Sequence, residues 1–211
     1  MRILYAVGSW GLGHATRSLQ LITSLQTAGA AVTVVSTGRA LILLRRELGA
    51  RCEFVDWPDV PQTISRSALG FYVRSAAAIP FMIWRMVRES QWTTRLVARQ
   101  RFDRLVSDNR YGVQHPRLPS FHIANSLRFI APGRIRAIEL LLESFNYRWF
   151  SRLRKVIVPD TVEDALTGDL THHLRVFPPS LVAYVGIISS IRARPLPQDI
   201  DLFISVSGPE P

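Results

Sequence analysis

The feature that most constrains how this chain can fold is a glycine-rich turn at residues 8–17, Gly-Ser-Trp-Gly-Leu-Gly-His-Ala-Thr-Arg. The apolar run at residues 3–7 predicts a buried strand before the turn, and the apolar spacing of residues 19–25 predicts a helix after it. Glycines let the backbone turn tightly and approach a ligand, and the N–H groups at a helix N-terminus favour an anion such as phosphate. Because His14 adds a titratable imidazole at this turn, the stretch indicates chemistry on a phosphorylated substrate.

Alternating strand and helix patterns follow this first unit. Further strands are predicted at residues 31–36, 52–56, 102–107, 121–124, 156–158 and 182–186. Helices are predicted at residues 37–48, at 70–101 with an interruption at Pro80, and at 135–150 with Ile138, Leu141, Leu142 and Phe145 on one face. This alternation predicts an α/β fold, a Rossmann-like doubly wound parallel sheet.

The end of the chain has a different composition. Residues 191–199 contain Arg192, Arg194, Pro195 and Pro197, which is typical of a linker. Residues 200–206 then predict a new strand, followed by a glycine turn. We therefore expect one domain at residues 1–190, a linker at 191–199, and at 200–211 the first strand and loop of a second α/β domain that is truncated or missing.

Composition narrows the partners and the compartment. The formal net charge is +10, which favours an anionic partner such as a phosphate, an acidic lipid headgroup or a nucleic acid. No recognition-helix or RNA-binding signature is present, so nucleic acid is the least favoured of the three. Cys52 is the only cysteine, which fits a reducing cytoplasm, and no apolar run reaches the ~18 residues that a membrane span needs. No histidine spacing fits a zinc site.

Residues 71–88 have two interpretations. They form a very apolar helical stretch with Trp84 and Phe81, and arginines lie within and beside it. Such a helix can lie in a membrane interface. The alternative is an ordinary core helix with solvated arginines, since apolar stripes usually face a core.

Topology predicts where the functional residues meet. In doubly wound sheets the usual order places the first strand beside the fourth, and ligands bind at the carboxyl ends of these strands. This brings His14, Asp108 and Arg110 to one crevice, as a candidate acid–base site. The alternatives are a helix-start histidine bonded to backbone and a simple Asp108-Asn109 turn with a solvated Arg110. Thr16 and Arg17 could contact phosphate, or Thr16 could satisfy free N–H groups of its helix.

Three segments together resemble a known family. Residues 11–14, 107–112 and 206–211 are similar to the N-terminal half of GT-B fold glycosyltransferases, in the group of the peptidoglycan UDP-N-acetylglucosamine transferase (glycosyltransferase family 28-like). The resemblance implies two Rossmann-like domains, of which the first binds the acceptor and the second the nucleotide sugar. It implies direct displacement with inversion at the anomeric carbon, and no metal or other cofactor.

The resemblance also assigns roles to residues. His14 would deprotonate the acceptor hydroxyl, and Gly11 and Gly13 would approach the donor diphosphate. Ser207 and Gly208 would form the first donor-side loop. The expected acceptor-binding residues are Thr16, Arg17, Asp108, Asn109 and Arg110.

The implied function is transfer of a hexosamine or hexose, from UDP-N-acetylglucosamine, to a lipid-linked acceptor hydroxyl. The expected partners are the nucleotide sugar, an anionic membrane surface on the inner face of the plasma membrane, and a donor domain in cis or in a separate chain. The alternatives are a non-catalytic membrane-docking subunit of a split enzyme and a UDP-sugar epimerase of the same fold. A dinucleotide oxidoreductase is disfavoured because the glycines follow G-x-x-G-x-G rather than G-x-G-x-x-G.

Overall fold

The computed structural model of this chain describes residues 1–61, 63, 65 and 67–189. The predicted linker at residues 191–199, the strand at 200–206, and both Ser207 and Gly208 lie outside the described residues.

The described residues form a seven-stranded sheet of parallel strands. The strands are β1 (Arg2–Val7), β2 (Ala31–Ser36), β3 (Glu53–Asp56), β4 (Arg104–Asp108), β5 (Ser120–Ile123), β6 (Lys155–Val158) and β7 (Val182–Tyr184). Their spatial order is β3-β2-β1-β4-β5-β6-β7. The predicted doubly wound sheet is confirmed, and β1 lies beside β4 as expected.

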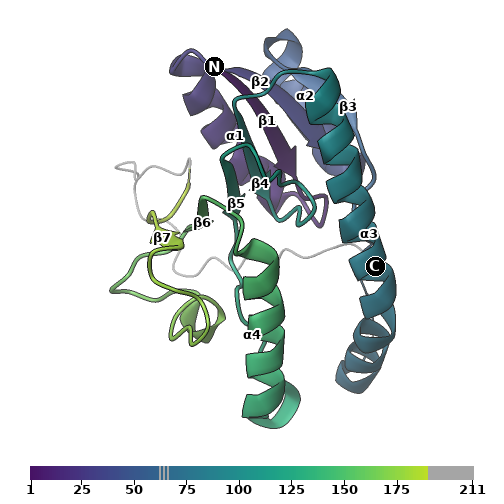
Figure 1. Cartoon of the computed structure of the whole chain (residues 1–211), viewed down its shortest axis with the longest axis vertical. Helices are drawn as coiled ribbons and strands as arrows, with labels where there is room; N and C mark the ends of the chain where they lie inside the picture. The colour runs from purple at the N-terminus through teal and green to yellow at the C-terminus, as the bar shows by residue number, and fades with distance from the viewer. Residues whose placement is uncertain (62, 64, 66, 190–211) are drawn as a thin grey trace, which may run out of the picture.

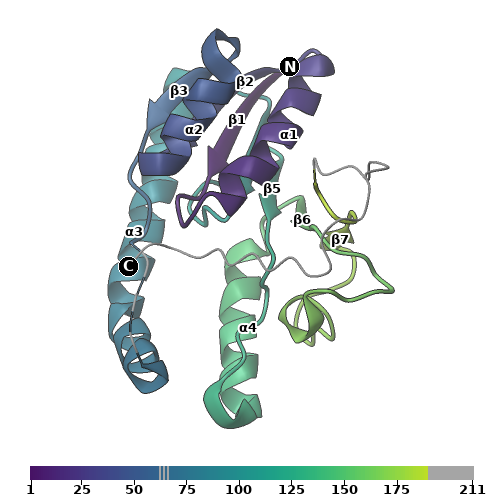
Figure 2. The same ribbon diagram turned by 180° about the vertical axis from the view of Figure 1, so that it is seen from behind.

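In the described part of the chain, four α-helices cover the sheet (Figures 1 and 2). They are α1 (Gly13–Thr27), α2 (Gly38–Leu48), α3 (Ala68–Arg99) and α4 (Arg136–Phe150), with short 3₁₀ turns at Gly49–Arg51, Pro132–Arg134 and Gly168–Leu170. The central strands β1, β2 and β4 are mostly buried, as expected for a parallel sheet between helices, while the edge strands β3 and β7 are partly exposed.

Strand alternation assigns each helix to a face. In β1, Tyr5 packs in one core cluster with Ile22 of α1 and Leu44 of α2. Leu4 and Ala6 point to the opposite face, into a cluster with α3. Ala6, Ser107, His122 and Val156 are paired in register across four strands, and Val156 packs with Phe150 of α4. Thus α1 and α2 cover one face, and α3 and α4 cover the other.

The helix α3 differs from its prediction. It is one 32-residue helix with Pro80 inside it, not two helices separated at the proline. Its second half is anchored to the sheet by buried Met86 and Glu89, so the core-helix interpretation holds there. Its first half is exposed, and the Trp84 side chain at its end is 47% exposed. The apolar stretch at residues 71–88 is therefore largely a surface feature.

The helix α4 does not bury the face that its apolar pattern favours. The opposite, more polar face packs against the rest of the chain. Ile138, Leu141 and Phe145 are exposed, Leu141 at 69% of its surface. The buried positions include Glu139, Glu143 and Asn146. These polar side chains have specific partners. Glu139 pairs with buried Arg128, Glu143 accepts the N–H groups of residues 175 and 176, and Asn146 donates to the carbonyl of residue 127.

The helices α3 and α4 both extend beyond the carboxyl ends of the strands (Figure 1). Among the described residues, no helix combines the length and the apolar character needed to cross a bilayer.

Candidate functional site

The glycine turn lies against the end of β4. The N–H of Gly8 donates to the carbonyl of Asp108 at 2.8 Å, and a Cβ on Gly8 would lie only 3.2 Å from that oxygen. Gly11 has φ +78°, the left-handed conformation that favours glycine. A Cβ on Gly13 would meet no atom within 4 Å, so the approach to this side of the turn is open. The local backbone thus matches the predicted strand, turn and helix.

A buried carboxylate orients the turn histidine. The Nδ1 atom of His14 lies 2.8 Å from Oδ1 of Asp108, whose side chain is fully buried. Arg17 donates from Nε to Oδ2 of Asp108 at 3.0 Å and also pairs with Oδ1, and the Ser18 hydroxyl donates to Oδ2 at 2.9 Å. Arg17 Nη2 also lies 3.1 Å from Nδ1 of His14. Because a guanidinium can only donate hydrogen bonds, the Asp108 carboxylate is the acceptor for both His14 and Arg17.

The charge state of Asp108 follows from these contacts. Burial raises its pKa, but the hydrogen bonds from His14 and Arg17 outweigh burial and hold the pKa below its usual value. Asp108 is therefore ionised at neutral pH and acts as an acceptor only. This assigns the proton of a neutral His14 to Nδ1 and leaves Nε2 with its lone pair available to a substrate.

Arg110 does not share the crevice with His14. Its guanidinium is fully buried on the α3 face, where Nε donates to Oε1 of Glu89 at 2.7 Å and Nη1 donates to the carbonyl of Trp57 at 3.1 Å. Oε2 of Glu89 accepts the N–H of Gly112 at 2.9 Å. The expectation that Arg110 meets His14 is corrected: Asn109 has φ 59°, and this left-handed residue turns the chain so that Asp108 and Arg110 point to opposite faces.

The other predicted site residues lie as follows. The Thr16 hydroxyl donates to the carbonyl of Gly13 at 3.1 Å, so it does not satisfy a free N–H of the helix. Asn109 forms the turn after β4, and its N–H donates to the carbonyl of Ile123 at 3.2 Å. Thr16 and Asn109 are thus beside the His14 site, while Ser207 and Gly208 lie outside the described residues.

Sequence reasoning missed two parts of the site. Ser18 lies four residues after His14, on the same side of α1, and this spacing could have identified it. Asp59 comes from the loop at residues 57–61, where no pattern signals its role. Its Oδ2 accepts both the N–H and the hydroxyl of Ser9, at 2.8 and 3.0 Å, and thereby fixes the start of the glycine turn.

Within the described ranges, no group of three or more histidine, cysteine, aspartate or glutamate side chains could hold a metal ion.

Comparison with known proteins gives a consistent fold. A model of the glycosyl transferase family 1 matches residues 1–54, which include β1, the glycine turn and α1. No match was found among curated protein sequences.

Several solved structures are similar. UGT2 of Phytolacca americana, complexed with UDP-2fluoro-glucose and pterostilbene, aligns with TM-score 0.50 and 13% identity over 89% of this chain and 54% of that chain. UGT89C1 of Arabidopsis thaliana, complexed with UDP, aligns with TM-score 0.50 and 15% identity over 90% of this chain and 49% of that chain. MurG of Acinetobacter baumannii aligns with TM-score 0.48 and 12% identity over 92% and 47%.

This chain spans about half the length of the structures that it matches. At these identities the likeness shows the fold alone. The described chain has the Rossmann-like α/β fold of a domain of GT-B glycosyltransferases.

Proposed function

We propose that this chain is the acceptor-binding half of an inverting, metal-independent glycosyltransferase. The observation that carries the proposal is the His14–Asp108 pair at the end of a glycine turn, 2.8 Å apart and supported by Arg17 and Ser18. A histidine oriented by an ionised carboxylate is a general base, and the open side of the turn leaves room for a substrate.

The proposed reaction is a single displacement. Nε2 of His14 takes the proton of the acceptor hydroxyl as that oxygen forms a bond to the anomeric carbon of the donor sugar. The bond from this carbon to the nucleotide diphosphate breaks on the opposite side, so the configuration inverts. Asp108 stabilises the imidazolium that forms, and Arg17 keeps Asp108 ionised.

The donor binds across the glycine turn in this proposal. Gly11 and Gly13 allow the diphosphate to approach the first N–H groups of α1, where an anion is favoured. The remaining donor contacts come from a second domain, in cis or in a separate chain, with Ser207 and Gly208 in its first loop. The UDP ligands named for UGT2 and UGT89C1 support a UDP-sugar donor. The sequence resemblance favours UDP-N-acetylglucosamine among these.

The exposed half of α3 supports a lipid-linked acceptor at an anionic membrane. Phe71, Phe81 and Trp84 are each more than two-fifths exposed. Arg88 lies over the Trp84 ring, 5.1 Å from its centroid, and is itself exposed. Aromatic side chains beside arginines are typical of helices that lie in the interface of an anionic bilayer. The proposed location is the cytoplasmic face of the plasma membrane.

The same surface supports a second candidate function, a non-catalytic subunit that holds a separate donor-binding chain at the membrane. The two candidates differ in whether the His14 site is used.

The test is UDP release by this chain together with its donor-binding half, from UDP-N-acetylglucosamine and a lipid extract, with EDTA present. We expect lipid-dependent release that His14→Ala abolishes and that His173→Ala, a change at an exposed histidine outside the site, leaves intact. Equal release by the His14→Ala variant would contradict the catalytic proposal. Release that EDTA stops would contradict metal independence.

A further inference from the structure

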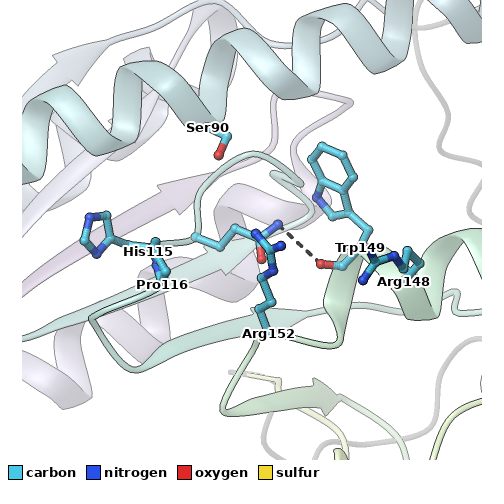
Figure 3. A pocket seen from close by; sticks show the side chains of 7 residues that line it. Ser90, His115, Pro116, Arg148, Trp149 and Arg152 are labelled. Atoms are coloured by element: carbon cyan, nitrogen blue, oxygen red, sulfur yellow. Dashed lines mark hydrogen bonds between the residues drawn. The ribbon is translucent and has the colours of Figure 1, made fainter.

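A cavity lies away from His14, on the face of the sheet that α3 and α4 cover. It measures about 260 Å³ and is lined by Ser90 of α3, by residues 114–116 of the β4–β5 connection, and by Arg148, Trp149 and Arg152 at the end of α4 (Figure 3). Figure 3 shows Ser90 and Arg152 entering it from opposite sides. Nothing in the proposed transfer reaction uses this cavity.

The cavity carries uncompensated positive charge. Arg148 lies in the last turn of α4 and Arg152 lies just beyond its end at Phe150, and both residues line the cavity. Within the described ranges neither guanidinium has an ion pair or a hydrogen bond, and no carboxylate lines the cavity. The partial negative charge at the C-terminus of α4 offsets only part of one of these two positive charges. A bound anion would neutralise the remainder.

Gln114 and Trp149 form the wall of the cavity beside the two arginines. The Oε1 atom of Gln114 is buried without a hydrogen-bond partner, while its Nε2 donates to the carbonyl of Trp149 at 3.4 Å. This oxygen is closed off from the cavity space, so Gln114 forms part of the wall and the arginines remain the charged ligands. The Trp149 indole N–H is already bonded to the carbonyl of Tyr111 at 2.7 Å, so the ring serves as an apolar wall.

An apolar stripe leads to this cavity along α4. Ile138, Leu141 and Phe145 are exposed at successive turns of the helix, and the Phe145 ring stacks on Trp149 with centroids 6.4 Å apart. The stripe and the two arginines together match a molecule with an anionic head and an apolar tail.

We propose that this cavity is a binding site for a phosphate group, with Arg148 and Arg152 as its charged ligands, and that the α4 stripe accepts the apolar part of a phospholipid that carries the group. Arginine suits this role because its planar fork of N–H donors matches phosphate oxygens.

The first test measures thermal unfolding of the whole chain in inorganic phosphate and in chloride of equal ionic strength. Phosphate should raise the unfolding midpoint of the wild type, because a ligand that binds only the folded state stabilises it. The rise should disappear in Arg148→Gln/Arg152→Gln. It should persist in Arg101→Gln/Arg104→Gln, which makes the same charge change at exposed arginines outside the cavity.

The second test identifies the source of the phosphate. Binding to vesicles of phosphatidylglycerol and phosphatidylcholine, compared with vesicles of phosphatidylcholine alone, should fall about tenfold in Arg148→Gln/Arg152→Gln, a change of about 1.4 kcal/mol. Leu141→Gln should weaken vesicle binding and leave the shift with inorganic phosphate unchanged.

The outcomes separate clearly. If inorganic phosphate raises the unfolding midpoint but the chain does not bind vesicles, the phosphate site is retained and the phospholipid is rejected as its ligand. The site itself would be overturned if both double variants lost the phosphate-induced shift equally, or if the wild type showed no shift. The arginines would then only offset the partial negative charge at the end of α4. Neither readout requires sugar transfer, so the result is independent of the His14 test.

Discussion

Nδ1 of His14 lies 2.8 Å from Oδ1 of Asp108, although 94 residues separate them in the chain. The contact follows from the pairing of β1 with β4, in which Val7 and Asp108 are opposite each other at the carboxyl ends of the strands. The site therefore depends on sheet register and on the glycine turn that returns α1 over the end of β4.

Asp108→Asn should impair both stability and transfer. The change removes a buried charge and leaves the Arg17 guanidinium, itself only 13% exposed, without its partner. Loss of one member of a buried pair costs about 3–5 kcal/mol, which urea unfolding would measure. The transfer rate should fall at least about 100-fold because His14 loses its orientation as a general base.

Glu163→Gln is the matched control for this change, since it removes one negative charge at an exposed position. Wild-type stability of the Asp108→Asn variant would show that Arg17 and Ser18 do not need the carboxylate.

Arg110→Met should destabilise the chain through Glu89. Burial raises the pKa of Glu89 and Arg110 opposes that rise, so loss of the arginine leaves a carboxylate that must protonate or remain unpaired. We expect a loss of about 3–5 kcal/mol in the free energy of unfolding. Adding Glu89→Gln should recover part of the loss, because the amide can still accept the Gly112 N–H. Strictly additive losses in this double-mutant cycle would show that the two side chains are not coupled.

Replacement by alanine should disturb the fold at Gly112 but not at Gly13. A Cβ on Gly112 would lie 2.5 Å from Cβ of Glu89 and 2.6 Å from the carbonyl of Met86, so Gly112→Ala should separate α3 from the sheet and lower the melting temperature by several degrees. Gly13 has open space around its Cβ position, so Gly13→Ala should preserve the fold. It should nevertheless weaken donor binding, measured as a higher KM for the nucleotide sugar. An unchanged KM would remove Gly13 from the donor site.

His122 should make the chain sensitive to acid. It lies between the rings of Tyr111 and Phe150, and burial lowers its pKa from 6.5 to about 3, with the nearby Asp108 charge opposing and His14 and Arg17 reinforcing the shift. Between these values the unfolded chain binds a proton that the folded chain does not, so stability falls as pH decreases, by up to about 1.4 kcal/mol per pH unit.

His122→Phe, which keeps an aromatic ring but removes the titrating group, should flatten the pH dependence of the urea midpoint between pH 6.5 and about 3. An equally steep decline in this variant would assign the acid sensitivity to other groups.

The sheet could be predicted from the sequence because its strands are apolar runs separated by glycine and helical patterns. The pairing of His14 with Asp108 followed from the usual strand order. The orientation of Arg110 could not be predicted, because it depends on the left-handed backbone of Asn109, and both turn and ligand roles are compatible with an Asp-Asn pair.

The helix α4 shows a second limit of sequence reasoning. Its period revealed two unlike faces, but periodicity does not say which face is buried. The answer depends on Arg128, a buried cation from the loop that precedes α4, which pairs with Glu139 and Glu143. Similarly, no local pattern indicates that Asp59 holds Ser9, because that contact joins two loops 50 residues apart.

The left-handed turn at Asn109 has a mechanical consequence. Asp108 is bonded to α1 and Arg110 to α3, so two adjacent peptide groups connect the helical layers on opposite faces of the sheet. A displacement of α3 on its exposed side would pull on Arg110 and be transmitted through Asn109 to the carboxylate that orients His14. The chain thus contains a short covalent connection between the α3 surface and its candidate base.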